Sequence, residues 1–432
     1  MRQMFEALLH GARPNLNSFI DVFGKAVPSL HLLDSTPQDP VWHNEGSVKV
    51  HTQMVLDELY REMEGSAPLP PEVQRELILG AVFHDLAKPW TTRRMEIQGV
   101  DRVAAPRHEA QGRSTLAPAL VDAGLPWPSL WHVLGMVGYH QAPKMLVVKN
   151  RGFEAYRNLS RKVDTNRVAW LERADMRGRT CPDQAAQLGH IEMFLMGMED
   201  YAPEGWHDQW RAYFLDLLAD RSLAFQDRVF GEAIRALEDG RIREPSDAGF
   251  LAHQEPDAPP ELVVLCGPSG SGKSTFVERY LGDHTPISLD ALREDMSGDR
   301  SDQSLNGAVR QEAKLQLKAA LRPGRKAVWD ATCLRKDFRS QVCQTGFDYG
   351  ALVTLVVFHL DRDAYALRNR NRAHPVPLKV LDSQLDQWEW PDIDEAHRLI
   401  VVDGASRVRG AFGICGDTLP WGLTPAHPEG GR

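Results

Sequence analysis

The chain has 432 residues, of which 42% are hydrophobic and 25% charged, and its formal net charge is −9. This length exceeds what one hydrophobic core usually supports, so it predicts two domains of ordinary size. The acidic balance argues against a protein that coats nucleic acid through bulk electrostatics. No apolar stretch is long enough to cross a bilayer and the N-terminus does not read as a secretory signal, so we expect a cytoplasmic protein with no membrane partner. Five scattered cysteines without a C-x-x-C pair fit free thiols in a reducing compartment.

One segment departs from the acidic balance of the whole chain. Residues 144–179 contain ten lysines or arginines and four acidic residues. Such a run is as typical of a solvated surface as of a phosphate-binding face, so both interpretations stay open.

The pattern of apolar residues divides the chain into two halves. Up to about residue 245 apolar residues recur at helical spacing, which predicts an all-helical half with a domain over 1–180 and a helical extension or bridge over 181–245. Residues 246–260 carry three prolines and no apolar periodicity, which is typical of a linker. Over 261–432 short apolar runs alternate with helical stretches, which predicts an α/β domain with a parallel sheet.

Two adjacent polar residues interrupt an apolar helical pattern in the first half. His84 and Asp85 stand inside ELILGAVFHDLAK, where packing alone does not explain them. Imidazoles and carboxylates from separate helices are the ligands expected of a Zn, Mn, Fe, Ni or Co site, and one bridging carboxylate can hold two such ions. The other candidate ligands, in chain order, are His51, His108, His140 and Asp175.

The order H…HD…H…H…D resembles the HD superfamily of metal-dependent phosphohydrolases. The phrases H-x-E-G-x-V-x-x-H-T, FHDLAKP, RHE and ADMRGR are similar to the HD domain of bacterial tRNA nucleotidyltransferases. The resemblance implies that Lys88 sits near the scissile phosphate. It implies a first metal on His51, His84, Asp85 and Asp175, and a second on His108 and His140 with Asp85 bridging.

The sequence leaves the roles of two further histidines open and argues against one activity of the similar transferases. His43 fits the phrase H-x-E-G-x-V-x-x-H-T but is not part of the minimal ligand set. It can therefore equally be a metal ligand or a residue that supports a ligand by a hydrogen bond. His132 lies two helical turns before His140 and can point elsewhere. Only about forty residues precede His43, fewer than a nucleotidyltransferase domain needs, so we do not expect CCA addition.

The second half opens on a complete phosphate-loop motif. Residues 267–274 read GPSGSGKS, with an expected strand over 261–266 and a helix over 274–281. Glycines let backbone N–H groups converge on phosphates, Lys273 adds a positive charge, and the Ser274 hydroxyl is suited to Mg²⁺. We therefore expect ATP or another NTP with Mg²⁺ as the phosphate donor. The predicted nucleotide-binding residues are Gly267, Gly270, Ser271, Gly272, Lys273, Ser274 and Thr275.

Three later phrases suggest what the phosphate loop serves. In SLDALRED, Asp290 and Arg293 can share one helix face; LRNRNRAHPVP is a dense arginine cluster; and VWDAT ends a strand at Asp330 and Thr332. Taken singly, Asp290 and Arg293 also fit an ordinary surface ion pair, and the arginine cluster also fits a solvated helix face.

Together these phrases resemble the 5′-hydroxyl polynucleotide kinase branch of P-loop phosphotransferases. The resemblance implies that Asp290 is the general base and Arg293 the clamp on an acceptor phosphate. It implies that Arg368 and Arg372 are lid arginines. Asp330 is left open between assisting Mg²⁺ through water and lining the acceptor groove with Thr332.

The order of the two halves is similar to the bacterial HD-Pnk family of end-healing enzymes. The resemblance implies metal-dependent 2′,3′-phosphoesterase activity, NTP-dependent phosphorylation of 5′-OH RNA or DNA ends, and an RNA ligase acting downstream. Two alternatives stay open: a nucleotidase HD domain fused to a small-molecule kinase, and an ATP-gated RNA-binding regulator with a structural HD site. The native metal, the RNA or DNA preference and the direction of ring opening are not fixed by the sequence.

Overall fold

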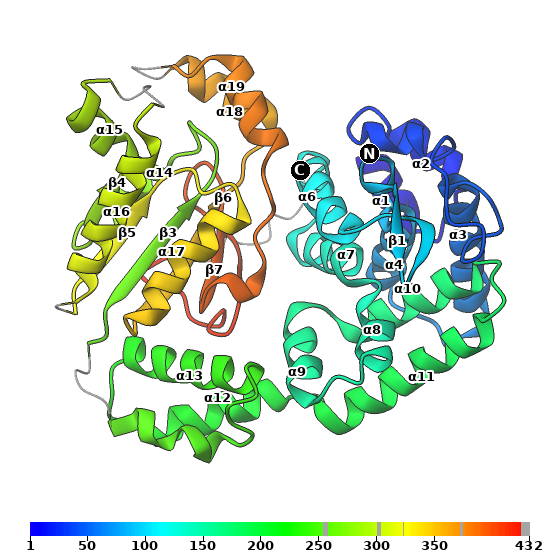
Figure 1. Cartoon of the computed structure of the whole chain (residues 1–432), viewed down its shortest axis with the longest axis horizontal. Coiled ribbons are helices and arrows are strands. Elements are labelled where there is room, and N and C mark those ends of the chain that lie inside the picture. The colour runs from blue at the N-terminus through cyan, green and yellow to red at the C-terminus, as the bar shows by residue number, and fades with distance from the viewer. Residues whose placement is uncertain (254–257, 300–303, 323, 372–374, 425–432) are drawn as a thin grey trace. The chain divides into compact units, whose positions relative to one another are not determined.

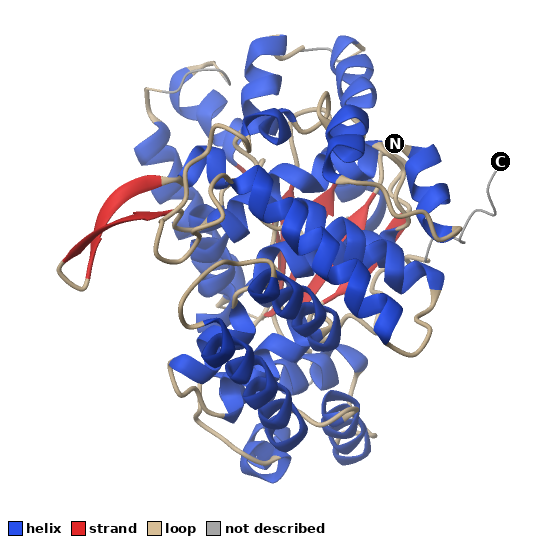
Figure 2. Ribbon diagram, turned by 90° about the vertical axis from the view of Figure 1, so that its right-hand side faces the viewer, coloured by secondary structure: helices blue, strands red, loops and turns tan. Residues whose placement is uncertain are grey.

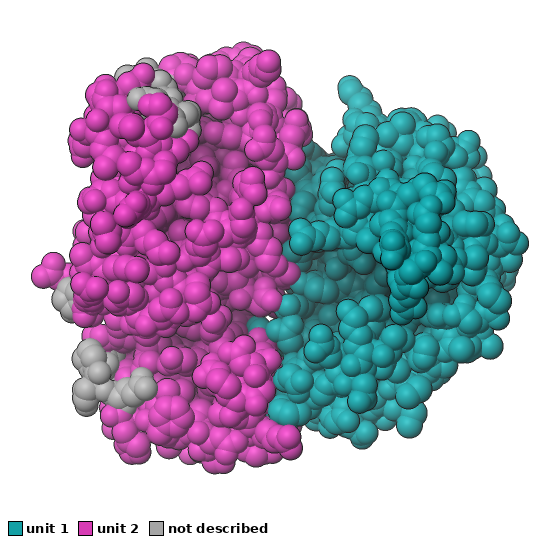
Figure 3. Space-filling model, viewed as in Figure 1, with its two compact units in different colours: residues 1–204 teal, residues 205–432 magenta. Residues whose placement is uncertain are grey.

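The computed structural model describes residues 1–253, 258–299, 304–322, 324–371 and 375–424. The chain divides into two compact units, Met1–Glu204 and Gly205–Arg432, which Figure 3 colours separately. In the described segments, no helix has the length and apolar character needed to span a membrane.

Unit 1 is built mainly from helices that pack around α4 (Pro71–Phe83). This helix contacts α1, α3, α7 and α10, and its residues from Leu77 to Phe83 are buried almost completely. The helices of unit 1 are α1 (Arg2–Leu9), α2 (Leu16–Phe23), η1 (Pro28–Leu32), α3 (Val48–Gly65), α4, α5 (Lys88–Thr91), α6 (His108–Asp122), α7 (Trp127–Tyr139), α8 (Ala142–Val148), α9 (Phe153–Lys162), α10 (Thr165–Arg177) and α11 (Gln184–Tyr201).

A β-hairpin interrupts the helices, so the prediction of an all-helical first half is wrong at this point. Strands β1 (Arg93–Ile97) and β2 (Val100–Ala104) pair antiparallel, and Figure 2 shows them projecting from the helical body. The two turn residues, Gln98 and Gly99, have φ of 51° and 78°, as a tight type I′ hairpin requires. The turn lacks the Asn-Gly or Asp-Gly pair that marks such hairpins in a sequence, so helical periodicity on both sides hid it.

Unit 2 contains a six-stranded sheet in the order β4-β5-β3-β6-β7-β8. All neighbours are parallel except β7 and β8, as the alternation of short apolar runs and helices predicted. The antiparallel edge strand β8 was not predicted. The strands are β3 (Glu261–Cys266), β4 (Thr285–Ser288), β5 (Lys326–Asp330), β6 (Leu352–Phe358), β7 (Arg398–Val402) and β8 (Val408–Phe412).

The sheet brings the motifs of the second half to one edge. Because parallel strands end on the same side, the loops after β3, β4, β5, β6 and β7 share that edge. In Figure 1, α16 and α17 run alongside β5 and β3. The helices of unit 2 are α12 (Trp206–Leu217), α13 (Leu223–Glu238), η2 (Pro245–His253), α14 (Lys273–Tyr280), α15 (Leu289–Ser297), α16 (Asn306–Leu321), α17 (Lys336–Asp348), α18 (Arg362–Arg370), α19 (Leu378–Asp386) and η3 (Ile393–Glu395).

The segment expected to bridge the halves is shared between the units. Helix α11 belongs to unit 1, whereas α12 and α13 belong to unit 2. Part of the expected linker forms η2, which contacts α12 and α13 and buries Ala248 and Leu251.

A buried ion pair fixes the loop that follows β5. Arg339, at 0% exposure, donates to both carboxylate oxygens of Glu395 at 2.7 and 3.0 Å. It also donates to the carbonyl oxygens of Cys333 and Leu334 at 3.0 and 2.8 Å. This guanidinium therefore holds the chain just after Asp330 against η3.

We predict that Arg339→Met lowers the free energy of unfolding of unit 2 by about 3–5 kcal/mol, because a buried carboxylate loses its partner. Denaturant unfolding followed by tryptophan fluorescence measures this loss. Arg362→Met, which removes an exposed pair with Asp386, is the control and should unfold like the parent protein. Equal unfolding midpoints for the two variants would contradict the structural role of Arg339.

Candidate metal centre and nucleotide site

The adjacent His84 and Asp85 lie at a break between two helices. Helix α4 ends at Phe83 and α5 begins at Lys88, so the pair stands in the intervening turn rather than inside a helix. Both side chains are buried, at 0% and 2% exposure. Because the apolar helix α4 is buried, the two polar residues that follow its last turn also lie in the core.

Three histidines of unit 1 repeat one hydrogen bond. His84, His108 and His140 each place Nδ1 against the carbonyl oxygen three residues earlier, at 2.8, 2.7 and 3.1 Å. Because a carbonyl oxygen only accepts, each Nδ1 carries the hydrogen. In the neutral ring, Nε2 is then left with its lone pair and no hydrogen, which is the form that binds a metal ion.

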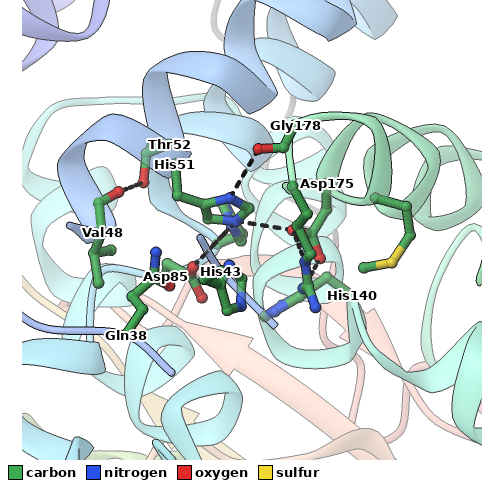
Figure 4. A network of polar contacts seen from close by, with 12 residues as sticks. Gln38, His43, Val48, His51, Thr52, Asp85, His140, Asp175 and Gly178 are labelled. Atoms are coloured by element: carbon green, nitrogen blue, oxygen red, sulfur yellow. Dashed lines mark hydrogen bonds and ion pairs between the residues drawn. The ribbon is translucent and has the colours of Figure 1, made fainter. Parts of the chain in front are cut away.

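His51 reaches the same state by another route. Its Nδ1 lies 3.0 Å from Glu45 Oε1 and 3.3 Å from the carbonyl oxygen of Gly178, and both of these atoms accept. Its Nε2 lies 2.9 Å from Asp175 Oδ1, as Figure 4 shows. A lone pair on Nε2 facing a carboxylate oxygen requires a cation or a proton between them.

The six predicted ligands form two neighbouring groups. In each group the candidate ligand atoms all lie within 4.8 Å of one another. Asp85 faces both groups, because its Oδ2 is 3.1 Å from His84 Nε2 and its Oδ1 is 3.2 Å from His108 Nε2. The groups are His51, His84 and Asp175, and Asp85, His108 and His140, and every member is buried.

The unsatisfied atoms of this cluster fit a bound cation. Among the residues that the structure describes, Nε2 of His51 and Nε2 of His84 are buried without a hydrogen-bond partner. Oδ2 of Asp85 has the Lys88 ammonium 2.7 Å away. His108 Nε2 and His140 Nε2 lie 3.2 Å apart, and both are acceptors in the neutral rings. Two facing lone pairs repel unless a cation lies close to both. Nitrogen and carboxylate donors in this mixture suit Zn, Mn, Fe, Co or Ni.

The electrostatics keep Asp85, Asp175 and His140 in the forms that a metal needs. For His51, burial is outweighed by hydrogen bonds with Asp175 and Glu45, which raise the pKa of the ring, so this ligand loses a proton when a metal binds. Burial opposes ionisation of Asp85, but His84 and Lys88 outweigh it and hold the pKa of Asp85 well below its usual value. For Asp175, burial is likewise outweighed, by Arg179 and His51, and the pKa is again lowered. Burial lowers the pKa of His140 well below its usual value. Charged carboxylates and a neutral imidazole at neutral pH favour metal binding.

The other residues predicted for this site take different places. Lys88 Nζ lies 2.7 Å from Asp85 Oδ2 and donates to Gln38 Oε1 at 2.8 Å. His43 Nδ1 lies 2.8 Å from Glu45 Oε1, so it joins the cluster through that carboxylate. His132 lies apart from it and contacts Glu76 Oε2 through Nδ1 at 3.0 Å.

Two residues of the cluster were not predicted. Glu45 accepts from His51 and from the backbone N–H of Thr180, and Arg179 pairs with both oxygens of Asp175. Both residues stand in phrases that carried the resemblance, H-x-E-G and ADMRGR, and the acid two residues after His43 was the available signal.

Several basic side chains of the segment 144–179 are not available to bind phosphate. Several of its arginines form ion pairs inside unit 1, which favours the interpretation of these residues as structural. Arg167 pairs with Glu76, Arg173 and Arg177 pair with Glu62, and Arg179 pairs with Asp175.

In unit 2 the phosphate loop joins β3 to α14. Gly270 and Gly272 have φ of 81° and 103°, a backbone region that side chains disfavour. Lys273 Nζ donates to the carbonyl oxygens of Gly267 and Pro268 at 2.9 and 2.8 Å, so the ammonium lies over the loop. The Gly267 N–H donates to the carbonyl oxygen of Thr332 at 2.9 Å, which joins the loop to the end of β5.

The predicted acid–arginine pair stands at the same edge. Ser288 pairs in register with Asp330, and Asp290 follows in the first turn of α15. Arg293 pairs with Asp290 and donates from Nε to Asn306 Oδ1 at 3.1 Å. Burial raises the pKa of Asp330; Lys273 opposes this shift and the charge of Asp290 adds to it. The predicted Lys273, Asp290 and Asp330 are therefore electrostatic neighbours.

One of the two predicted lid arginines reaches the phosphate loop. Arg368 Nη2 donates to the carbonyl oxygen of Gly404 at 2.6 Å, and a Cβ added to Gly272 would lie 3.4 Å from Arg368 Nη1. Arg372 lies outside the described residues. Gln384, which the sequence did not single out, accepts at Oε1 from the Ser269 N–H at 2.9 Å.

Comparison with known proteins supports the assignment of unit 2. Residues 262–391 match the family described as AAA domain. Together with the GPSGSGKS motif between β3 and α14, this match shows a P-loop domain in unit 2. Among curated proteins, none matches the chain.

Two solved structures illustrate the range of similarity. A gluconokinase from Sinorhizobium meliloti 1021 is 23% identical over 34% of this chain and 83% of its own, with a TM-score of 0.26. A chain of the PezAT chromosomal toxin-antitoxin system of Streptococcus pneumoniae is 13% identical over 41% of this chain and 82% of its own, with a TM-score of 0.27. At these TM-scores neither structure bears on the function of this chain.

We predict that Mn²⁺, Co²⁺ or Zn²⁺ added to chelator-treated protein raises its unfolding temperature, because the ions bind the folded cluster. An ion at 100 times its Kd contributes about 2.7 kcal/mol to folding. His84→Ala should lose most of this gain, whereas the control His132→Ala should keep it. Equal gains in His84→Ala and His132→Ala would refute the ligand assignment.

We predict that Arg368→Ala lowers nucleotide-dependent phosphoryl transfer about 10²-fold, because a cation beside the phosphate loop is lost. Release of the nucleoside diphosphate measures the rate. The exposed Arg370→Ala, on the same helix, should retain the parent rate. The assignment fails if Arg368→Ala and Arg370→Ala are equally active.

Proposed function

We propose that this chain heals broken nucleic-acid ends with two activities. Unit 1 removes 2′,3′-cyclic phosphate and terminal 2′- or 3′-phosphate groups in a metal-dependent hydrolysis. Unit 2 phosphorylates the 5′-OH end of RNA or DNA with ATP or another NTP. An RNA ligase acting downstream would then find the termini that it needs.

One observation carries this proposal: a single chain joins a buried histidine–aspartate cluster to a phosphate loop that faces an acid–arginine pair. Both sites suit phosphoryl chemistry, and they suit opposite tasks, since one donor set fits hydrolysis and the other fits transfer. RNA cleaved by transesterification bears a cyclic phosphate on one end and a 5′-hydroxyl on the other. The pairing of the sites matches this pair of ends.

In unit 2, the acceptor is inferred from Asp290 and Arg293. The Asp290 side chain is 69% exposed, so an acceptor hydroxyl can reach it and pass its proton to the carboxylate. The hydroxyl oxygen forms a bond to the γ-phosphorus while the bond between the γ-phosphorus and the β–γ bridging oxygen breaks. Lys273 and Arg368 balance the charge of the transferring group.

Arg293 favours a polynucleotide over a nucleoside as the acceptor. Its guanidinium, with 13% of the side chain exposed, stands beside Asp290 and can bind a phosphate next to the reacting hydroxyl. A nucleoside has no such phosphate, so in a nucleoside kinase Arg293 would make only its contacts with Asp290 and Asn306. This difference separates end healing from the small-molecule alternative.

In unit 1, the six buried ligands form two groups and would hold two divalent ions, which would supply an activated water and neutralise phosphoryl oxygens. Lys88 is one helical turn after His84 and lies against Asp85, where its ammonium can balance the charge of a bound phosphate. Asp85, through its two oxygens, and Asp175, held by Arg179, orient the cluster.

We predict that the two activities separate by mutation. An oligonucleotide with a 5′-OH and a 2′,3′-cyclic phosphate reports both, through 5′ labelling and through loss of the cyclic phosphate. Asp290→Asn should lower 5′ labelling about 10²–10⁴-fold and leave 3′ healing intact, since only the general base is lost. Asp85→Asn should abolish 3′ healing and spare the kinase. The exposed Asp295→Asn, also on α15, is the control.

Each half can fail separately. Phosphorylation of adenosine without phosphorylation of the oligonucleotide would contradict the assignment of a polynucleotide acceptor and would favour the small-molecule kinase. Unchanged 3′ healing in Asp85→Asn would sink the metal-dependent phosphoesterase. ATP binding without any phosphoryl transfer would favour the regulatory protein.

A further inference from the structure

A cavity of about 530 Å³ opens in unit 2 between α16, α17 and β5. Its size lies in the range of small-molecule and nucleotide pockets. The residues that matter for its chemistry are Arg310 and Lys314 of α16, Trp329 of β5, Arg335 just before α17, and Phe338 and Gln341 of α17.

The cavity lies next to the acceptor edge of the sheet. Trp329 immediately precedes Asp330 at the end of β5. Arg293 donates to Asn306, the first residue of α16, and Arg310 stands one helical turn further along that helix. A strand whose 5′-OH reaches Asp290 therefore has this cavity beside it.

The lining combines two aromatic side chains with positive charge. The Arg310 guanidinium lies 5.4 Å from the ring centroid of Phe338, and the rings of Phe338 and Trp329 are 6.0 Å apart. Arg310, Lys314 and Arg335 are exposed, and Asp337 in the same lining pairs with Arg335, so the charge of these four is positive. Such a site favours an anion that carries an aromatic ring.

A buried polar atom also needs a partner here. Trp329 is 2% exposed, and its indole N–H has no hydrogen-bond partner among the described residues. Buried N–H groups of this kind are nearly always paired. An occupant that brings an acceptor atom would satisfy it.

We propose that this cavity binds one nucleotide of the acceptor strand, downstream of the 5′-OH. Its base lies against Phe338, an acceptor atom of the base takes the Trp329 N–H, and Arg310 and Lys314 hold the flanking phosphates. The inference deepens the proposed kinase function and rests on it, because it makes the acceptor a single-stranded nucleic acid rather than a mononucleotide.

An abasic scan tests the inference on the full-length protein. A fluorescent 5′-OH oligonucleotide is titrated intact and with one abasic residue at each successive position, without ATP. The parent protein should bind about tenfold more weakly when one specific position lacks its base, because base stacking on an aromatic ring is lost. Phe338→Ala should bind the intact strand about tenfold more weakly and should be insensitive to the abasic residue at that position.

A second variant and two controls complete the test. Arg310→Ala, at an exposed position that does not open the core, should weaken binding and reduce the slope of log affinity against log salt by about one. Leu315→Ala on the same helix and Arg322→Ala at its C-cap, both outside the cavity lining, should bind like the parent protein. The ATP affinity of each variant reports whether the nucleotide fold is intact.

The outcomes separate the two proposals. The cavity assignment is overturned if no abasic position changes the affinity, or if both Phe338→Ala and Arg310→Ala bind like the parent protein. If the parent protein fails to phosphorylate any 5′-OH oligonucleotide, the proposed function itself falls.

Discussion

The hydrogen bond from an imidazole Nδ1 to the carbonyl oxygen three residues earlier organises unit 1. It recurs at His84, His108 and His140, which lie at the end of α4, the start of α6 and the end of α7. Each bond leaves a bare Nε2 pointing into the core, where His108 and His140 bring two such atoms within 3.2 Å. Burying these unpaired acceptor atoms is unfavourable unless a positive charge lies near them. The same hydrogen bonds therefore fix the imidazole rings in the core and favour a bound cation.

Unit 2 is suited to neutralise the negative charge of phosphate with other groups. Its positive groups are backbone N–H groups of the phosphate loop, the ammonium of Lys273 and the guanidinium of Arg368, and all are placed by the ends of parallel strands. Donors of this kind, which do not enclose the phosphate, suit a group that is transferred and released, whereas buried ligands suit ions that stay in place. The buried Arg339 holds the strand end that carries Asp330, so the acceptor edge depends on interior packing as well.

The sequence predicted the features that a motif marks and missed those that no motif marks. The phosphate loop and its flanking strand and helix were predicted because one short segment contains the whole motif. The six histidine and aspartate ligands were predicted from their order and their resemblance to a family, and they do come together. Glu45 was missed although it stands two residues after His43, because its contact with the N–H of Thr180, 135 residues away, is marked by no local pattern. The hairpin at Gln98 and Gly99 was missed because its turn residues are not the usual pair.

The number of divalent ions bound per chain tests the central claim most directly. Equilibrium dialysis of chelator-treated protein against Mn²⁺, followed by metal analysis, gives this number without any assay of activity. The two groups bridged by Asp85 predict two tightly bound ions in the parent protein, and one in His140→Ala, which alters a single group. An absence of tightly bound ions in the parent protein, or the same number in His140→Ala, would contradict the metal centre described for unit 1.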